Sequence, residues 1–281
     1  MKCFYHNDLD GRCSGAIVNL YRRNQENDGT GFYFIEIDYK DRFPLETISP
    51  NEEIWIVDFS LKPEVMNELL KVTQNIIWID HHATAKEYGY ADLKGLRDFK
   101  DKGNAGCELT WQYCFPDRKM PSSVLLIGDY DKWALKMQPE CFEFYEGLKL
   151  EDTNVKAIIW KELFSDDTLS SDIIHNGKTS IKYRDNYCSQ LRKSFGYETE
   201  IDGYKAYATN MYMFGSKGFG HMMDNYPLCI AYIHDGKMFT VSCYSTKIDV
   251  SVICKNHGGG GHKGAAGFIT SHLPFKKENH V

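Results

Sequence analysis

The first eighty residues alternate short β-rich runs with segments of helical periodicity. The β-rich runs are CFYH (3–6), GFYFIEID (31–38), EIWIVDFS (53–60) and NIIWID (75–80). The first two are separated by residues 11–23, which place Ile17, Leu20 and Tyr21 on one helical face, and the last two by a segment that Pro63 opens. Strands that alternate with helices predict a mostly parallel sheet with right-handed crossovers. The N-terminal part of the chain is therefore expected to be an α/β fold.

The rest of the chain predicts a helical extension and then a smaller α/β domain. Residues 104–194 have helical patterns, and β-rich runs return after residue 203, with Asp235-Gly236 as a hairpin turn. We expect a first domain over residues 1–194 and a second over 205–281. Glycines and acids gather in residues 195–204, which we interpret as the linker. The active site is expected in the cleft between the two domains.

Composition excludes several classes of protein. The net charge of −6 argues against a protein that grips long duplex DNA, because such proteins carry a basic face. The nine cysteines are odd in number and form no C-x-x-C pair, as in cytoplasmic proteins with reduced thiols. No apolar stretch approaches the roughly 18 residues that span a bilayer, and the acidic residues near the N-terminus do not fit the pattern of a signal peptide, so we expect none. We expect a cytoplasmic protein with no membrane partner.

Acids and histidines stand at the ends of four predicted elements. They are His6, Asp8 and Asp10 at and just beyond the end of the first run, Asp58 near the end of the third, Asp80-His81-His82 at and just beyond the end of the fourth, and Asp129 at the end of LLIGD, with Asp131 as its alternative. Taken singly, each acid also fits a helix cap or a turn. Because parallel strands share one carboxyl edge, however, these side chains are expected to converge.

Converging carboxylates repel one another and are costly to bury unless cations neutralise them. A mixture of carboxylate and imidazole suits Mn²⁺, with Mg²⁺, Fe²⁺ and Zn²⁺ as alternatives. The set holds more ligands than one octahedral ion needs. We therefore expect two divalent ions.

A second pattern is the glycine-rich run from Gly258 to Gly267, which includes His262 and Lys263. Glycines let backbone N–H groups approach an anion closely, and His or Lys adds positive charge. A flexible loop is the alternative interpretation. Because the run leads directly into a strand-like segment, we favour the binding of a phosphate or nucleotide.

With these motifs, in this order, nearly the whole chain resembles the DHH phosphoesterase superfamily with its DHH-associated C-terminal domain, whose hallmark is the Gly-Gly-Gly-His loop. The resemblance implies a parallel-sheet DHH catalytic domain and a smaller α/β substrate-binding domain. It also implies Mn²⁺-dependent hydrolysis of phosphodiester bonds in short or single-stranded oligonucleotides or nucleotides by a two-metal mechanism. A phosphoanhydride hydrolase acting on polyphosphate or pyrophosphate, and a non-catalytic nucleotide sensor, are the alternatives. The oligomeric state is left open.

The resemblance further implies roles for individual residues. One ion would be bound by His6, Asp8 and Asp58, and the second by Asp10, Asp58, His81 and Asp129, so that Asp58 bridges them. His82 would face the substrate phosphate, and Asp80 would orient the histidines. The substrate-binding residues of the C-terminal domain would be Ser245, Gly259, Gly260, Gly261, His262 and Lys263. The chain departs from the family at Tyr244, where many relatives carry arginine; Lys247 or Lys263 would have to supply that charge.

Overall fold

The computed structural model describes residues 1–25, 31–90, 92–165 and 167–276, which form two units, Met1–Ser180 and Ile181–Val281. The fold is mixed α/β, as the sequence predicts. Within the described residues, no helix combines the length and apolar character needed to cross a bilayer.

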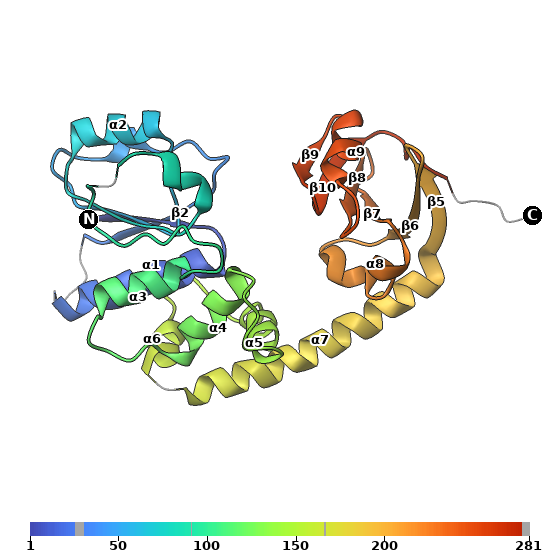
Figure 1. Ribbon diagram of the computed structural model, residues 1–281. Helices are drawn as coiled ribbons and strands as arrows, with labels where there is room; N and C mark the ends of the chain where they lie inside the picture. The colour runs from blue at the N-terminus through green and yellow to red at the C-terminus, as the bar shows by residue number, and fades with distance from the viewer. Residues whose placement is uncertain (26–30, 91, 166, 277–281) are drawn as a thin grey trace, which may run out of the picture. The chain divides into compact units, whose positions relative to one another are not determined.

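Unit 1 is built on a parallel sheet with strand order β2-β1-β3-β4. Helix α2 lies on one face of the sheet, and α1 and α3 lie on the other (Figure 1). The strands are β1 (Lys2–His6), β2 (Tyr33–Ile37), β3 (Ile54–Val57) and β4 (Ile76–Ile79), and the helices are α1 (Leu9–Gln25), α2 (Pro63–Val72) and α3 (Gly106–Cys114).

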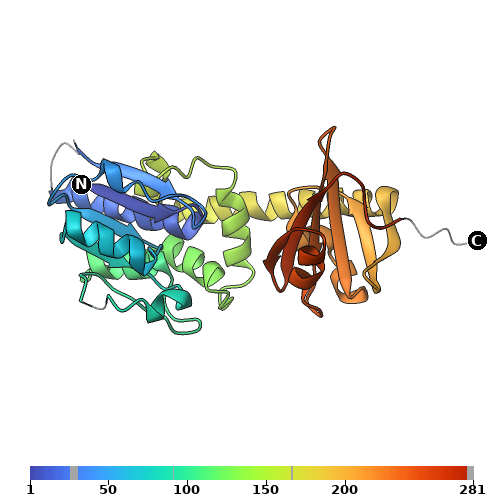
Figure 2. The same cartoon turned by 90° about the horizontal axis from the view of Figure 1, so that it is seen from above.

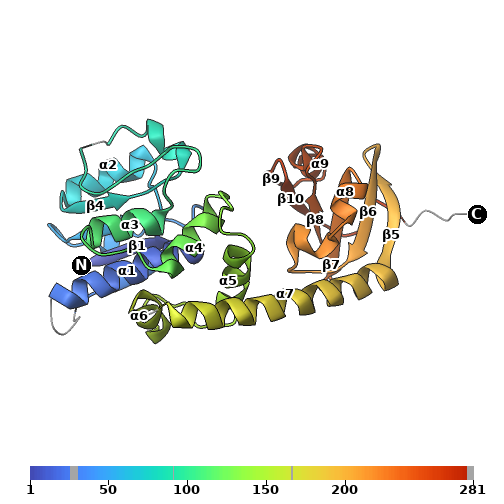
Figure 3. The ribbon, with the colours of Figure 1, turned by 60° about the horizontal axis from the view of Figure 1, so that its bottom comes forward.

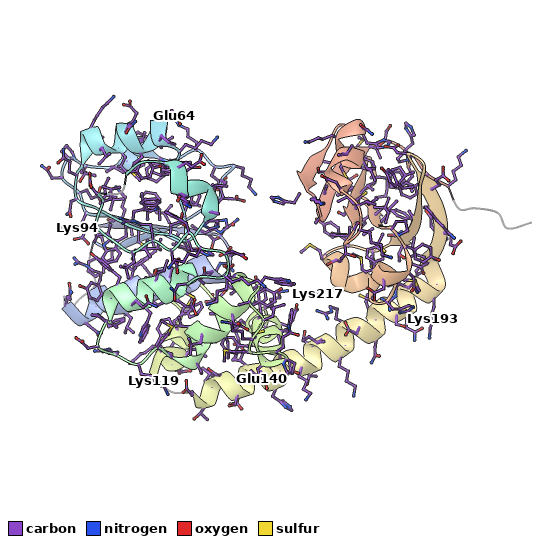
Figure 4. All side chains as sticks on the ribbon, in the orientation of Figure 1. Glu64, Lys94, Lys119, Glu140, Lys193 and Lys217 are labelled. Atoms are coloured by element: carbon purple, nitrogen blue, oxygen red, sulfur yellow. The ribbon has the colours of Figure 1, made fainter. Side chains whose placement is uncertain are left out.

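Strands β3 and β4 are apolar and buried at every position because both faces of this part of the sheet are covered. In β3, Ile54 and Ile56 pack in the cluster that includes Met66 of α2, whereas Trp55 and Val57 pack in the cluster of α1 and α3. Side chains fill the space between the sheet and the helices on each of its faces (Figure 4). This packing fixes the sheet, and with it the positions of the residues that follow each strand.

The helical extension that the sequence predicts is present beyond α3. Helices α4 and α6 contact α1, and α5 packs on α4 (Figure 3). Their bounds are α4 (Ser122–Asp131), α5 (Glu140–Leu148), α6 (Ile158–Ser165) and α7 (Thr168–Phe195).

Unit 2 contains the last part of α7 and a mixed sheet of strand order β5-β6-β7-β8-β10-β9, whose strands lie side by side in Figure 2. The predicted turn at Asp235-Gly236 is confirmed, since it joins the antiparallel strands β7 and β8. The elements are β5 (Gly196–Ile201), β6 (Tyr204–Asn210), η3 (Gly215–Phe219), α8 (Met222–Asn225), β7 (Leu228–His234), β8 (Phe239–Tyr244), α9 (Val250–Asn256), β9 (Gly260–His262) and β10 (Ala265–Thr270).

The segment 195–204, expected to be a linker, is instead structured. Residues 196–201 form β5, which pairs along its length with β6, and the chain divides into its two units earlier, after Ser180 within α7. The reason is a two-residue alternation: Thr199 and Ile201 are buried, whereas Glu200 between them is exposed. Acids on the outer face of an edge strand discourage pairing with other chains, and they gave this strand the composition of a linker.

Candidate metal centre

The sheet of unit 1 delivers polar side chains to its carboxyl edge. β1 ends at His6, Asp58 follows β3 and Asp80 follows β4. Since β3 pairs in parallel with both β1 and β4, three segments far apart in the sequence end side by side. This is the edge at which open α/β sheets bind their ligands.

Gly11 allows α1 to start very close to the end of β1. Its N–H donates to Oδ1 of Asp8 at 2.9 Å, and a Cβ at this position would lie 2.1 Å from the backbone oxygen of His6. Oδ2 of Asp8 lies 2.7 Å from Nδ1 of His6. Burial raises the pKa of Asp8, but the close contact and charge of His6, the hydrogen bond from Gly11 and the neighbouring Asp58 together outweigh it, and the net shift is downward. Asp8 is therefore ionised and faces the imidazole.

Asp10 links α1 to the start of α3. Its buried carboxylate accepts the N–H groups of Gly106 and Cys107, each at 2.8 Å. These are the first residues of α3, where the helix dipole favours an anion. The Oδ2 atom of Asp10 also lies 3.6 Å from Nε2 of His81. The first turn of α1 thus reaches the residues that follow β4.

Asp58 is the central residue of the group. It has a left-handed backbone with φ of 52°, a conformation that costs energy in a residue other than glycine, and its side chain is buried. Its oxygens lie 3.1 Å from Nε2 of His81 and 3.8 Å from Nδ1 of His6, yet neither has a hydrogen-bond partner in the described part of the chain. Burial, and then the neighbouring carboxylates, raise the pKa of Asp58 well above its usual value.

The side chains form three overlapping groups with ligand atoms within 4.8 Å of one another. They are His6, Asp8 and Asp58; Asp58, His81 and His82; and Asp10, His81 and Asp131. Carboxylate oxygen and imidazole nitrogen together suit divalent first-row metals. The unsatisfied buried oxygens of Asp58 are the atoms that a cation would satisfy, because an unpaired buried carboxylate is strongly disfavoured. The residues present therefore fit a divalent metal centre.

The structure separates Asp129, our first choice for the last ligand, from this group. Both of its oxygens are used locally, since they accept the N–H groups of Lys136 and Met137 at 2.9 and 2.8 Å. Asp131, two residues later at the end of α4, places Oδ2 3.3 Å from Nε2 of His81. Residues two apart on a helix point in different directions, so only one of the two acids can reach the site. Asp131 takes the place of Asp129.

Asp80 holds the second histidine of the triplet. Its fully buried carboxylate has Oδ1 2.7 Å from Nδ1 of His82, and its other oxygen accepts the hydroxyl of Ser60. Burial lowers the pKa of His82, but the hydrogen bond and charge of Asp80, with the charges of Asp131 and Asp10, outweigh it, and the net shift is upward. Tyr39, which the sequence did not single out, lies beside the imidazoles of His6 and His82. The centroid of its ring is 5.4 Å from that of His6 and 5.7 Å from that of His82.

The predicted substrate residues of unit 2 lie on β9 and at its ends. Gly259 is packed so tightly that a Cβ there would come 2.1 Å from the backbone oxygen of Gly267, whereas His262 and Lys263 are exposed. Gly261 has φ of 144°, which explains a glycine at that position. The run is thus a strand that pairs with β10, not a free loop.

Ser245 has a different role from the one expected. Its hydroxyl donates to the carbonyl of Pro227 at 2.7 Å and accepts the N–H groups of Lys247 and Ile248 at 2.9 Å each. These bonds use the donor and both lone pairs of the hydroxyl. Ser245 therefore shapes the turn before α9 with the hydroxyl that was expected to contact the substrate.

No family model matches the chain. The uncharacterized protein R106 of Acanthamoeba polyphaga mimivirus is 27% identical over 252 residues, which cover 84% of this chain and 58% of that protein. The chain thus spans less than two thirds of the length of this curated relative.

Solved structures establish the fold. The DHH domain of PF0399, described as a member of the s1p family of ribosomal proteins, superposes with a TM-score of 0.60 at 13% identity, covering 96% of this chain and 82% of that one. The chain has the fold of the DHH superfamily. Two further DHH-type neighbours each match 96% of this chain. The pGpG-specific phosphodiesterase PggH of Vibrio cholerae has a TM-score of 0.57 at 9% identity, and the match covers 92% of its chain. The exonuclease RecJ bound to manganese has a TM-score of 0.53 at 13% identity, and the match covers 85% of its chain.

Two residues at this site, Gly106 and Tyr39, are not among those predicted from the sequence. Gly106 allows α3 to come close to the side chain of Asp58, because a Cβ on Gly106 would lie 2.6 Å from Oδ1 of Asp58. The signal was present in the small residues of GNAG (103–106), since such runs often allow two backbones to approach. Tyr39 had no comparable signal, because in a chain with 18 tyrosines one more aromatic residue after a β-rich run stands out in no way.

Proposed function

We propose that this chain is a metal-dependent phosphoesterase that hydrolyses short, single-stranded nucleic acid. The observation that carries the proposal is Asp58: a buried carboxylate with two unsatisfied oxygens, set between His6 and His81. Such a site is costly without cations, and it occurs on a fold shared with RecJ bound to manganese. The pGpG-specific phosphodiesterase among the neighbours supports a short substrate.

In the proposed arrangement, His6, Asp8 and Asp58 hold one divalent ion, and Asp10, Asp58, His81 and Asp131 hold a second. We propose Mn²⁺, with Mg²⁺ as the alternative. Ions bound there would lower the pKa of a coordinated water toward neutrality and polarise the phosphoryl group. Gly106 and Cys107 orient Asp10 through their N–H groups, which keeps one of its oxygens beside His81.

The remaining residues position and stabilise the substrate. Because Asp80 engages Nδ1 of His82, the Nε2 atom of that ring is left for a phosphoryl oxygen. The raised pKa of His82 favours the cationic form, which offsets negative charge that develops on the phosphoryl oxygens. His262 and Lys263, both exposed on unit 2, are proposed to bind a further phosphate of the substrate.

The test is hydrolysis by the purified chain with Mn²⁺, Mg²⁺ or no added metal. The substrates are labelled di- to pentanucleotides, pGpG, adenosine 3′,5′-bisphosphate and pyrophosphate. We expect metal-dependent cleavage of the oligonucleotides, its loss in Asp58→Asn, and full activity in Asp172→Asn, which changes an exposed aspartate on α7. Hydrolysis of pyrophosphate alone would favour a phosphoanhydride hydrolase, and binding without turnover of any substrate would favour a nucleotide sensor. Either result would overturn the proposal.

A further inference from the structure

An exposed row of aromatic rings runs along one side of unit 2. Tyr183 and Tyr187 are four residues apart on α7, and their rings lie nearly parallel, at 13° with centroids 6.1 Å apart. The ring of Phe214 continues the row, 5.9 Å from that of Tyr187. Tyr183 is 71% exposed and Tyr187 is 46% exposed. Much of this aromatic surface therefore faces solvent instead of a core.

The loop that carries Phe214 has an energetically unfavourable conformation. Met213 has a left-handed backbone with φ of 69° and a side chain that is 83% exposed, so both its conformation and its exposure are unfavourable. Neighbouring Tyr212 is 51% exposed. Strained and solvent-exposed apolar residues of this kind concentrate where a protein binds a ligand.

The same loop forms one wall of a pocket on the sheet. The pocket has a volume of about 280 Å³, and its floor is formed by Ala231, Thr240, Ser242 and Tyr244 of β7 and β8. Ala231 and Ser242 are directly opposite each other in the strand register, and the shortness of these side chains leaves the face of the sheet open. Phe214 belongs both to the pocket wall and to the aromatic row. The pocket and the row are therefore continuous.

The segment of α7 that carries Tyr183 and Tyr187 is positively charged, although the whole chain carries −6. The part of α7 in unit 2, residues 181–195, has four basic side chains and one acidic one, a net charge of +3. Lys193 in its last turn and Lys217 on η3 are labelled in Figure 4. Aromatic rings beside basic side chains are the combination that binds single-stranded nucleic acid, because bases stack on the rings and phosphates attract the cations.

We propose that Tyr183, Tyr187, Phe214 and the adjoining pocket bind consecutive bases of a single-stranded nucleic acid. The inference rests on the proposed function in taking the substrate to be a nucleic acid, and it adds a site for nucleotides outside the metal centre. A second copy of the chain is a less suitable occupant. In a symmetric dimer across this face, the same basic segments of α7 would meet and repel each other.

The experiment measures binding without hydrolysis. Fluorescence anisotropy with excess EDTA follows a fluorescein-labelled thymidine decamer and an abasic decamer of equal length. We expect the full-length wild-type protein to bind the thymidine strand more tightly than the abasic one. Tyr187→Ala should weaken binding of the thymidine strand by about 5- to 150-fold, the range for loss of one stacked base, and should change abasic binding little. Tyr187→Phe should bind like wild type, as should Tyr204→Ala, which changes an exposed tyrosine on β6.

The outcomes separate this inference from the proposed function. Hydrolysis of bis(p-nitrophenyl) phosphate with Mn²⁺, a substrate that has no base, should be equal in Tyr187→Ala and wild type. If no substrate is hydrolysed but Tyr187→Ala still loses selectivity for the thymidine strand, the phosphoesterase proposal fails and the stacking site stands. Equal binding of the two strands by wild type, or unchanged thymidine affinity in Tyr187→Ala, overturns the stacking site. A change of oligomeric state in Tyr187→Ala on sedimentation, with unchanged affinity, assigns the face to self-association and also overturns it.

Discussion

Gly106 lies directly against the carboxylate of Asp58. A Cβ on Gly106 would come within 2.6 Å of both the Cβ and Oδ1 of Asp58, closer than atoms of two side chains approach. The N–H of the same glycine donates to Asp10 at 2.8 Å. One residue without a side chain thus sets the position of two proposed metal ligands, although it has no group that binds a metal.

Gly106→Ala should disable the site without removing a ligand. The added methyl group displaces the side chain of Asp58 or the start of α3, and residues that support metal ligands typically contribute about 10- to 100-fold in metal affinity or activity. Overpacking also costs stability, ~1–3 kcal/mol. Titration with Mn²⁺, followed by calorimetry, and urea unfolding in EDTA measure the two effects separately.

The matched control for Gly106→Ala is Gly264→Ala. At Gly264 the nearest atom to an added Cβ is the backbone oxygen of Ser245 at 3.4 Å, an ordinary contact, and the position lies in unit 2. Its metal affinity and unfolding free energy should match those of wild type. Wild-type Mn²⁺ affinity in Gly106→Ala would show that Asp58 does not bind metal in the position described.

Two aspartates near the end of α4 should respond in opposite ways to the same substitution. Asp131→Asn removes a proposed ligand, so activity should fall by at least ~100-fold while the unfolding free energy in EDTA does not decrease. Asp129→Asn turns an acceptor of two backbone N–H groups into one that offers a single oxygen. It should destabilise the fold by about 1–3 kcal/mol and leave the activity of the folded fraction intact. The opposite pattern would restore Asp129 as the ligand.

The choice between these two acids shows where sequence reasoning ends. Strand ends were predictable because β1, β3 and β4 are continuous apolar runs, and a parallel sheet brings their carboxyl ends together whatever else the chain does. Asp129 and Asp131 are on a helix, where a shift of two residues turns a side chain away from its previous direction. Which one faces the site depends on how α4 packs, and that is a tertiary property.

Similar limits apply in unit 2. β5 was taken for a linker because its exposed acids outweighed the alternation of Thr199 and Ile201. Ser245 was predicted to contact the substrate from the family resemblance alone, but the turn before α9 uses its hydrogen bonds. The pairing of β5 with β6 and the hydrogen bonds of Ser245 decide the roles of these segments. Both depend on which groups meet in the folded chain, which the sequence does not show.

The stability of the metal-free protein should fall as pH rises from about 4 to about 8. Burial, together with Asp10 and Asp8, raises the pKa of Asp131 to about 8, and the pKa of Asp58 is also well above its usual value. The folded state therefore retains protons that the unfolded state has lost, so each such carboxyl makes the unfolding free energy decrease with pH, by up to about 1.4 kcal/mol per pH unit.

This pH dependence is measured by urea unfolding in EDTA between pH 5 and pH 8. Asp58→Asn should flatten the slope and raise the stability at pH 8, since the neutral amide needs no proton, whereas the buried carboxyl must take one up on folding at a cost that grows with pH. Saturating Mn²⁺ should stabilise wild type more at pH 8 than at pH 5, because bound metal replaces protons. A slope that is the same in wild type and Asp58→Asn would mean that the carboxyls are not held protonated by one another.

Asp80→Asn should change the pH dependence of catalysis in addition to its rate. Asp80 raises the pKa of His82 against the opposing effect of burial, so the substitution should lower that pKa and move the alkaline limb of kcat/KM to lower pH. The rate at the optimum should drop by about 10- to 100-fold, as is usual when the group that orients a catalytic-site histidine is lost.

Ser60→Ala is the control, because it removes the hydrogen bond to the other oxygen of Asp80 and keeps the charge beside His82. Its alkaline limb should stay in place, and NMR titration of His82 in the metal-free protein checks the pKa directly. An unchanged limb in Asp80→Asn, with a lowered pKa of His82 by NMR, would remove His82 from the set of groups whose proton matters for hydrolysis.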